Sequence, residues 1–214
     1  DKPTGEFTFD GSEDTWEGDY TGADDASLIL ALNNGATWTG AKESNGNLDL
    51  TLNNHGIWNN TSENATTVNK LSGKGGFVKM NTADGSDVTI GEYAGETTFI
   101  YRHNAKNEIQ GGKVTIEKVD TDSIVNVRTN SIGTSNIKEV EDVLRALAAK
   151  LYAGDAAKTK LKGYAQIAEG IVTSASALKV GDIEFTGTDG QGVLNVGSIT
   201  SKYDDSDYIY GDSE

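Results

Sequence analysis

Closely spaced aspartates are the residues in this chain whose type and spacing could do chemistry. They form three groups: Asp24 with Asp25, Asp120 with Asp122, and Asp204 with Asp205 and Asp207. Two carboxyl groups held about 5–9.5 Å apart hydrolyse a glycosidic bond, one as the acid and the other as the nucleophile or base. Asp120 and Asp122 could share one face of a strand, because side chains two positions apart point the same way. Solvated turns are the more common setting for such pairs, and we interpret all three groups as turn residues.

The two histidines stand outside any recognisable catalytic motif. His55 occupies a bend whose counterpart carries Gly35, and His103 follows a strand, so we interpret both as surface residues. The chain has no Gly-x-Ser-x-Gly elbow and no His-Glu-x-x-His pair. Residues 73–76, Gly-Lys-Gly-Gly, lack the spacing of a phosphate-binding loop and are interpreted as a turn.

The basic residues give little support to a polysaccharide lyase. Lyases of acidic sugars use arginine or lysine bases, and the only arginines are Arg102, Arg128 and Arg145. Arg145 lies in a predicted helix and is not expected to join the other two. We therefore predict no catalytic, cofactor-binding or metal-binding residues and a chain that is not an enzyme. A β-helix polysaccharide hydrolase or lyase is the alternative.

The net charge of −15 gathers at the two ends of the chain. Residues 1–25 hold nine acids and one lysine, and residues 201–214 hold five acids and one lysine. Nucleic acids and anionic membrane surfaces both require clusters of lysine and arginine, so neither is an expected partner. We interpret the acidic ends as solvated, with calcium binding as the lesser alternative. Tyr203, Tyr208 and Tyr210 alternate with acids in the tail and are interpreted as packing or linker residues rather than as a recognition strand.

Two absences narrow the class of protein further. The chain contains no cysteine, which excludes disulfides and thiolate metal sites. No stretch approaches the roughly 20 apolar residues that a membrane-spanning helix needs. Direct membrane insertion by this segment is therefore not expected.

A repeat of twenty residues supplies the elements that position these side chains. Residues 30–38, Leu-Ala-Leu-Asn-Asn-Gly-Ala-Thr-Trp, return as residues 50–58, Leu-Thr-Leu-Asn-Asn-His-Gly-Ile-Trp. A fixed period of this length is typical of solenoids, in which each repeat stacks on the next. Alternating leucines indicate a strand with one buried face, and the asparagine pair suits a bend because asparagine tolerates left-handed backbone. Trp38 and Trp58 are expected to stack inside successive coils, and the fold class is therefore all-β, a β-helix.

Later segments continue the strand pattern with one interruption. Apolar residues at intervals of three and four predict a helix over 137–151, with Asn136 as its N-cap and Gly154 ending it. We expect this inserted helix to dock on its own solenoid rather than on a partner. We predict one solenoid segment over 1–200, followed by an acidic tail at 201–214. Within it lie coils at 28–104, further strands at 110–200 and a helical insertion at 136–153, with the last strands at 165–172, 177–185 and 193–199.

Three stretches together resemble the passenger region of bacterial autotransporters of the pertactin-like type. They are the two Leu-x-Leu-Asn-Asn…Trp coils, residues 68–78 (Val-Asn-Lys-Leu-Ser-Gly-Lys-Gly-Gly-Phe-Val), and Asp87-Val88-Thr89-Ile90 with the following Gly95 and Phe99-Ile100-Tyr101. The resemblance covers roughly residues 16–104. Residues 110–200 also resemble passenger segments of surface proteins from anaerobic diderm bacteria, through the helical stretch 143–152 and the strand at 165–170.

The resemblance implies a right-handed parallel β-helix that is exported through an outer-membrane barrel and displayed on the surface of a diderm bacterium. It implies a non-catalytic virulence-type adhesin or adhesin stalk whose partners are glycans or proteins of a host or a neighbouring cell. Repeated Asn, Thr and Gly give a polar, uncharged flank suited to hydrogen bonding. A self-assembling surface-layer component is a further alternative, and some self-association is expected of a solenoid with an open end.

Overall fold

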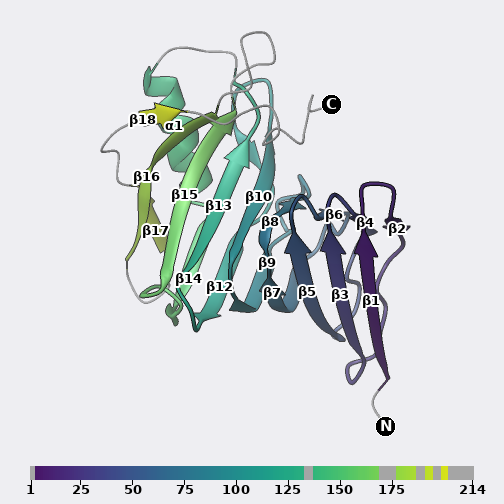
Figure 1. The fold of residues 1–214 in the computed structure, drawn as a ribbon. Coiled ribbons are helices and arrows are strands. Elements are labelled where there is room, and N and C mark those ends of the chain that lie inside the picture. Colours follow the sequence, from purple (N-terminus) through teal and green to yellow (C-terminus); the bar gives the residue numbers. More distant parts are fainter. Residues whose placement is uncertain (1–2, 133–136, 169–176, 187–190, 195–198, 202–214) are drawn as a thin grey trace.

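The computed structural model describes residues 3–132, 137–168, 177–186, 191–194 and 199–201. The molecule is mostly β, with 56% strand and 6% helix, and forms a right-handed β-solenoid. Two parallel sheets make up its walls (Figure 1). Sheet 1 contains β1 (Thr4–Asp10), β3 (Ser27–Asn33), β5 (Asn47–Asn53), β7 (Thr66–Ser72), β9 (Val88–Tyr93), β12 (Val114–Val119) and β14 (Leu151–Ala156). Sheet 2 contains β2 (Thr15–Glu17), β4 (Thr37–Gly40), β6 (Ile57–Asn60), β8 (Lys74–Lys79), β10 (Glu96–His103), β13 (Ser123–Thr129) and β15 (Leu161–Ala168).

The twenty-residue repeat is the register of these sheets. Leu28 pairs with Leu48, Leu30 with Leu50 and Leu32 with Leu52, so leucines form continuous columns along the solenoid. All of these leucines are buried, and full burial of each contributes about 1.5–3 kcal/mol to folding.

The tryptophans form a matching stack in sheet 2. The ring centroids of Trp16 and Trp38 lie 5.0 Å apart, and those of Trp38 and Trp58 lie 4.9 Å apart, with nearly parallel planes. The indole N–H of Trp38 donates to the Gly18 carbonyl, and that of Trp58 donates to the Gly40 carbonyl. The predicted stacking inside successive coils is confirmed, and Trp16 continues the stack at the N-terminal end.

The bends after the leucine strands have the predicted left-handed backbone. Asn34 has φ 53°, Asn54 has φ 40°, and the equivalent residues Gly35 and His55 have φ 88° and 68°. A different turn follows β7, where Gly73 has φ 103° and a Cβ would lie 2.2 Å from the Leu52 carbonyl oxygen. Glycine is therefore required at that position.

The inserted helix is shorter than the sequence predicts. Helix α1 spans Ile137–Ala148, because Lys150 already pairs its carbonyl with the Val114 amide and begins the next coil. Leu151, the last residue of the predicted stripe, belongs to β14, and Gly154 lies inside that strand instead of ending the helix. The predicted N-cap, Asn136, falls outside the described residues.

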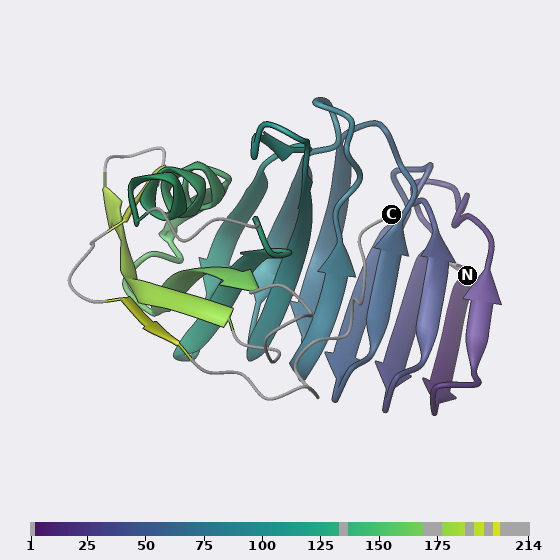
Figure 2. The same ribbon diagram turned by 90° about the horizontal axis from the view of Figure 1, so that it is seen from above.

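Helix α1 docks on its own solenoid, as predicted. Val140, Leu144 and Leu147 are buried in the same apolar core as the strands. The helix contacts β13, β15 and the short strand β11 (Ile109–Gln110), at the end of the solenoid opposite the N-terminus (Figure 2). Within the described residues, no helix is long and apolar enough to span a membrane.

The last strands depart from the predicted parallel winding. β16 (Ala177–Thr186) runs antiparallel to β15, and β17 (Gln191–Leu194) and β18 (Ile199–Ser201) pair antiparallel with β16. Alternating apolar residues cannot distinguish the two pairings, because both have a period of two. Residues 169–172 and 195–198 of two predicted strands, and residues 202–214 of the tail, lie outside the described part of the chain.

Candidate functional site

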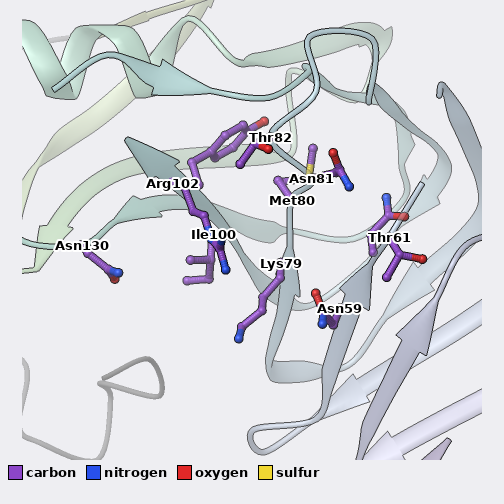
Figure 3. Close-up of a pocket in the computed structure, with 11 residues that line it drawn as sticks. Asn59, Thr61, Lys79, Met80, Asn81, Thr82, Ile100, Arg102 and Asn130 are labelled. Atoms are coloured by element: carbon purple, nitrogen blue, oxygen red, sulfur yellow. The ribbon is translucent and has the colours of Figure 1, made fainter. Parts of the chain in front are cut away.

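A polar groove crosses the carboxyl ends of successive strands in sheet 2, with a cavity volume of about 220 Å³. Four neighbouring coils contribute to it, each at the point where its strand turns away from the sheet. We call it the asparagine groove (Figure 3). Its lining comprises Asn59, Asn60, Thr61, Lys79, Met80, Asn81, Thr82, Ile100, Tyr101, Arg102 and Asn130.

The register of the parallel strands places these side chains side by side. Asn59 pairs with Lys79, and Lys79 pairs with Ile100. Neighbouring strands lie about 4.8 Å apart, so each coil adds one side chain to a row across the groove. Arg102 and Asn130 extend the lining at the ends of β10 and β13.

Asn60 is the least satisfied side chain of the groove. It is only 3% exposed, and its Oδ1 accepts a hydrogen bond of 2.9 Å from the Ser62 amide. That bond fixes which side of the amide is the oxygen, so Nδ2 is the donor that remains. Among the described residues Nδ2 has no hydrogen-bond partner. An unpaired buried donor costs about 1–3 kcal/mol, and an acceptor on a ligand would remove this cost.

The groove is basic although the chain is strongly acidic. Lys79 and Arg102 both line it, and none of its lining residues is an aspartate or a glutamate. Arg102 is exposed and makes no ion pair with any residue that the structure describes.

Tyr101 forms part of the groove wall and is not available for proton transfer. Its ring is buried, and its hydroxyl donates a hydrogen bond of 2.7 Å to the Gly112 carbonyl. Burial, with a smaller contribution from the charge of Asp87, raises the pKa of the Tyr101 hydroxyl well above its ordinary value. The groove therefore offers hydrogen-bond donors and positive charge, and its lining holds no carboxylate for acid–base work.

The aspartate pairs lie in turns, as interpreted from the sequence. Asp24 and Asp25 are exposed in the turn before β3. Asp120 and Asp122 lie in the connection between β12 and β13, not on a strand face, and Asp120 pairs with Lys118 at 3.6 Å. The third group, Asp204, Asp205 and Asp207, is outside the described residues.

His55 lies in the bend between β5 and β6, His103 is the last residue of β10, and neither lines the asparagine groove. The His55 ring stacks on Phe77 at a centroid distance of 6.0 Å. The ring nitrogens of His103 lie 3.1 and 3.0 Å from the carbonyl oxygens of Asn104 and Ser131. Both side chains are half-buried, whereas the sequence predicts exposed surface residues. In the described part of the chain, no three His, Asp or Glu residues are placed to hold a metal ion.

A second groove, which sequence reasoning missed, lies between α1 and the connection from β10 to β12. Its cavity volume is about 670 Å³, and Glu108, Glu139 and Asp142 are among its lining residues. All three are exposed; Asp142 pairs with Lys138 at 3.4 Å, and Glu108 accepts a hydrogen bond from Asn104. We call it the helix groove. The local sequence does not predict this groove, because Glu108 is brought to Glu139 and Asp142 only when the helix docks.

The first coil leaves an apolar hollow of about 340 Å³ at the N-terminal end of the solenoid. Phe7, Phe9, Trp16 and Tyr20 line it, and Phe7 is 55% exposed. This is the surface through which the expected self-association would act.

The asparagine groove was also missed from the sequence. The signal was present, since Asn59-Asn60-Thr61 and Asn81-Thr82 are short polar runs at the ends of two predicted strands. Without the register, these runs could not be assigned to one edge of one sheet.

Comparison with known proteins identifies no relative: no family model, no curated protein and no solved structure matches the chain. The likeness to autotransporter passengers therefore stays a prediction from the sequence.

Proposed function

We propose that this chain is a non-catalytic binding module of a bacterial surface protein, an autotransporter passenger segment that acts as an adhesin. Its ligand is a glycan that binds in the asparagine groove. The solenoid holds the groove on a stack of hydrogen-bonded coils, away from the cell that displays it. The observation that carries the proposal is Asn60, a residue of the groove lining whose buried Nδ2 has no hydrogen-bond partner among the described residues.

The chemistry of the groove suits a sugar better than an apolar ligand. Asparagine and threonine side chains supply donors and acceptors in a row, and sugar hydroxyls require both. The row crosses several coils, so an extended oligosaccharide could contact more than one of them. Since the surrounding strands are paired on both sides, the row is already in place before the ligand arrives.

The fold supports surface display through its construction. Each coil is buried by its neighbours, so a solenoid can form coil by coil without a single central core. Absence of cysteine suits a chain that crosses an oxidising compartment unfolded. These features are compatible with an autotransporter passenger.

The proposal is tested by applying the purified domain to a broad panel of glycans and matrix proteins while monitoring polymer cleavage in the same wells. We expect saturable binding to a narrow set of glycans without cleavage. Binding to proteins alone would contradict the glycan proposal and leave a protein-binding adhesin. No binding at all would contradict the adhesin and leave the segment as a stalk.

A polysaccharide hydrolase is the second candidate, because three carboxylates line the helix groove. All three are exposed, whereas the acid of a glycosidase is usually held in a dry, apolar pocket. The same assay distinguishes the hydrolase from the adhesin when it is repeated with Glu139→Gln and Glu108→Gln. The control is Asp84→Asn, which lies in an exposed turn. Cleavage that both groove variants abolish and the control retains would establish the hydrolase and overturn the adhesin.

A further inference from the structure

We infer that the asparagine groove selects an acidic oligosaccharide, whose anionic group is held between Lys79 and Arg102. This inference rests on the proposed function and adds the charge of the ligand to it. Carboxylated and sulfated sugars share the required chemistry, an oxyanion beside several hydroxyls.

The two basic side chains come from neighbouring strands and share one side of the groove. Lys79 ends β8, and Arg102 is the penultimate residue of β10, which pairs with β8 in parallel. Figure 3 shows Lys79 and Arg102 between Asn59 on one side and Asn130 on the other. The arginine fork matches the geometry of a carboxylate or sulfate, and lysine adds a second positive charge.

The lining of the asparagine groove contains two basic side chains and no acidic residue, in a chain of net charge −15. Acids are far more numerous than bases in this sequence, so a groove lining without them is a local exception.

The buried amide of Asn60 points to the same kind of ligand. Its Nδ2 requires an acceptor, and an oxyanion has acceptors only. A ligand with an anionic group and adjacent hydroxyls would satisfy Nδ2 and be attracted by both cations. A neutral sugar would satisfy the amide alone and would gain nothing from the positive charge of the groove.

The test is a glycan array on which each carboxylated or sulfated oligosaccharide is printed beside its neutral counterpart. The wild-type domain is expected to bind acidic members at least tenfold more tightly than their neutral pairs, with affinity that falls as salt is added. The double variant Lys79→Gln/Arg102→Gln should lose this preference. The matched control is Lys74→Gln/Arg145→Gln, which removes the same charges from exposed positions outside the groove and should bind as the wild type does.

Asn60→Asp provides an independent variant. The aspartate keeps an oxygen for the Ser62 amide but replaces the donor with a negative oxygen, so binding of acidic glycans should be lost. Circular dichroism of each variant checks that the solenoid remains folded.

The outcomes separate the inference from the proposed function. Binding of neutral glycans alone overturns the inference and keeps the proposed function. Acidic binding that the groove variants leave unchanged overturns the inference and also the assignment of the glycan to the asparagine groove. No glycan binding of any kind overturns both. Carboxylated and sulfated members on the array distinguish the two sources of the anionic group.

Discussion

Asparagines in two parts of the solenoid differ in their hydrogen bonding. In the bends of the regular coils, Asn53 donates to Asn33 and Asn54 donates to Asn34, at 3.0 and 2.7 Å. Asn60 pairs in register with Gly40, which offers no side chain, and the strand on its other side continues into Met80. The same residue type is therefore satisfied where the repeat holds and left with an unpaired donor where it fails.

The difference shows where a solenoid can bind something. A polar side chain that recurs at the same position of successive coils forms hydrogen bonds with its equivalents in the neighbouring coils. The resulting row of hydrogen bonds stabilises the fold. A polar side chain without an identical neighbour keeps its hydrogen-bonding capacity for a ligand. In this chain the regular coils up to Asn60 are mainly structural. The irregular coils after Asn60, in which the residues of the repeat no longer recur, contribute most of the groove lining.

Removal of a stacked tryptophan from the regular coils should have the largest effect. Trp38 is fully buried between Trp16 and Trp58, and Trp38→Ala is expected to lower the free energy of unfolding by about 3–5 kcal/mol. Urea denaturation followed by circular dichroism measures it. A loss below about 1 kcal/mol would mean that the stack is not part of the cooperative core.

Alkaline pH should destabilise the irregular coils after Asn60. Tyr93 and Tyr101 belong to these coils, and burial raises the pKa of both hydroxyls above the ordinary value of about 10. A raised folded-state pKa means that the stability is fully present below pH 10 and is lost as the pH rises above it. The loss is at most about 1.4 kcal/mol per pH unit for each tyrosine.

Tyrosine absorbance and tryptophan fluorescence, recorded together between pH 9 and about pH 12.5, distinguish the two regions. We expect tyrosine ionisation to be delayed relative to a denatured sample and to accompany unfolding. All tyrosines titrating as in the denatured chain would contradict the burial of these two hydroxyls.

Substitution of an asparagine that bonds to its equivalent in the next coil should lower the free energy of unfolding by a smaller amount. Asn53→Leu removes the bond to Asn33 and the acceptor for the Lys74 amide, so the free energy of unfolding should fall by about 1–3 kcal/mol. Glycan binding should be unchanged, because Asn53 does not line the groove. Lost binding with full stability would reverse the roles assigned to the two regions.

The same substitution at Asn60 should have the smallest effect on stability. Asn60→Leu removes the unpaired Nδ2 but leaves the Ser62 amide without its acceptor, so one unpaired donor replaces another. We expect the free energy of unfolding to change by less than about 1 kcal/mol, while glycan binding weakens at least tenfold. Denaturation and binding are measured on one preparation, and a loss of stability like that of Asn53→Leu would contradict the comparison.

The regular half of the fold was predictable because identical residues repeat at one spacing. Leu30 with Leu50, the Asn pairs and Trp38 with Trp58 indicate the strands, the bends and the stacking through their spacing alone. The helix was also predicted, but its end was not, since Leu151 fits the helical stripe and the strand equally well. The helix ends where β14 pairs with β12. This pairing joins residues far apart in the sequence, so a local pattern does not predict the boundary.

The groove could not be predicted because it depends on which side chains the neighbouring coils place beside Asn60. Asn60 is one of many asparagines in the sequence, and only the register shows that its neighbour is Gly40. Arg102 was considered as a possible lyase base, yet its place beside Lys79 follows from the pairing of β8 with β10. Side chains from four coils form the groove, and their spacing in the sequence is irregular.

The most direct test of the comparison is a ¹⁵N–¹H NMR titration of the asparagine side-chain amides with the acidic oligosaccharide that binds most tightly. We expect the Asn60 side-chain amide resonances to shift strongly and saturably, whereas those of Asn53 and Asn54 stay in place. Shifts confined to Asn53 and Asn54, or an unperturbed Asn60 at saturation, would show that Asn60 does not bind the ligand.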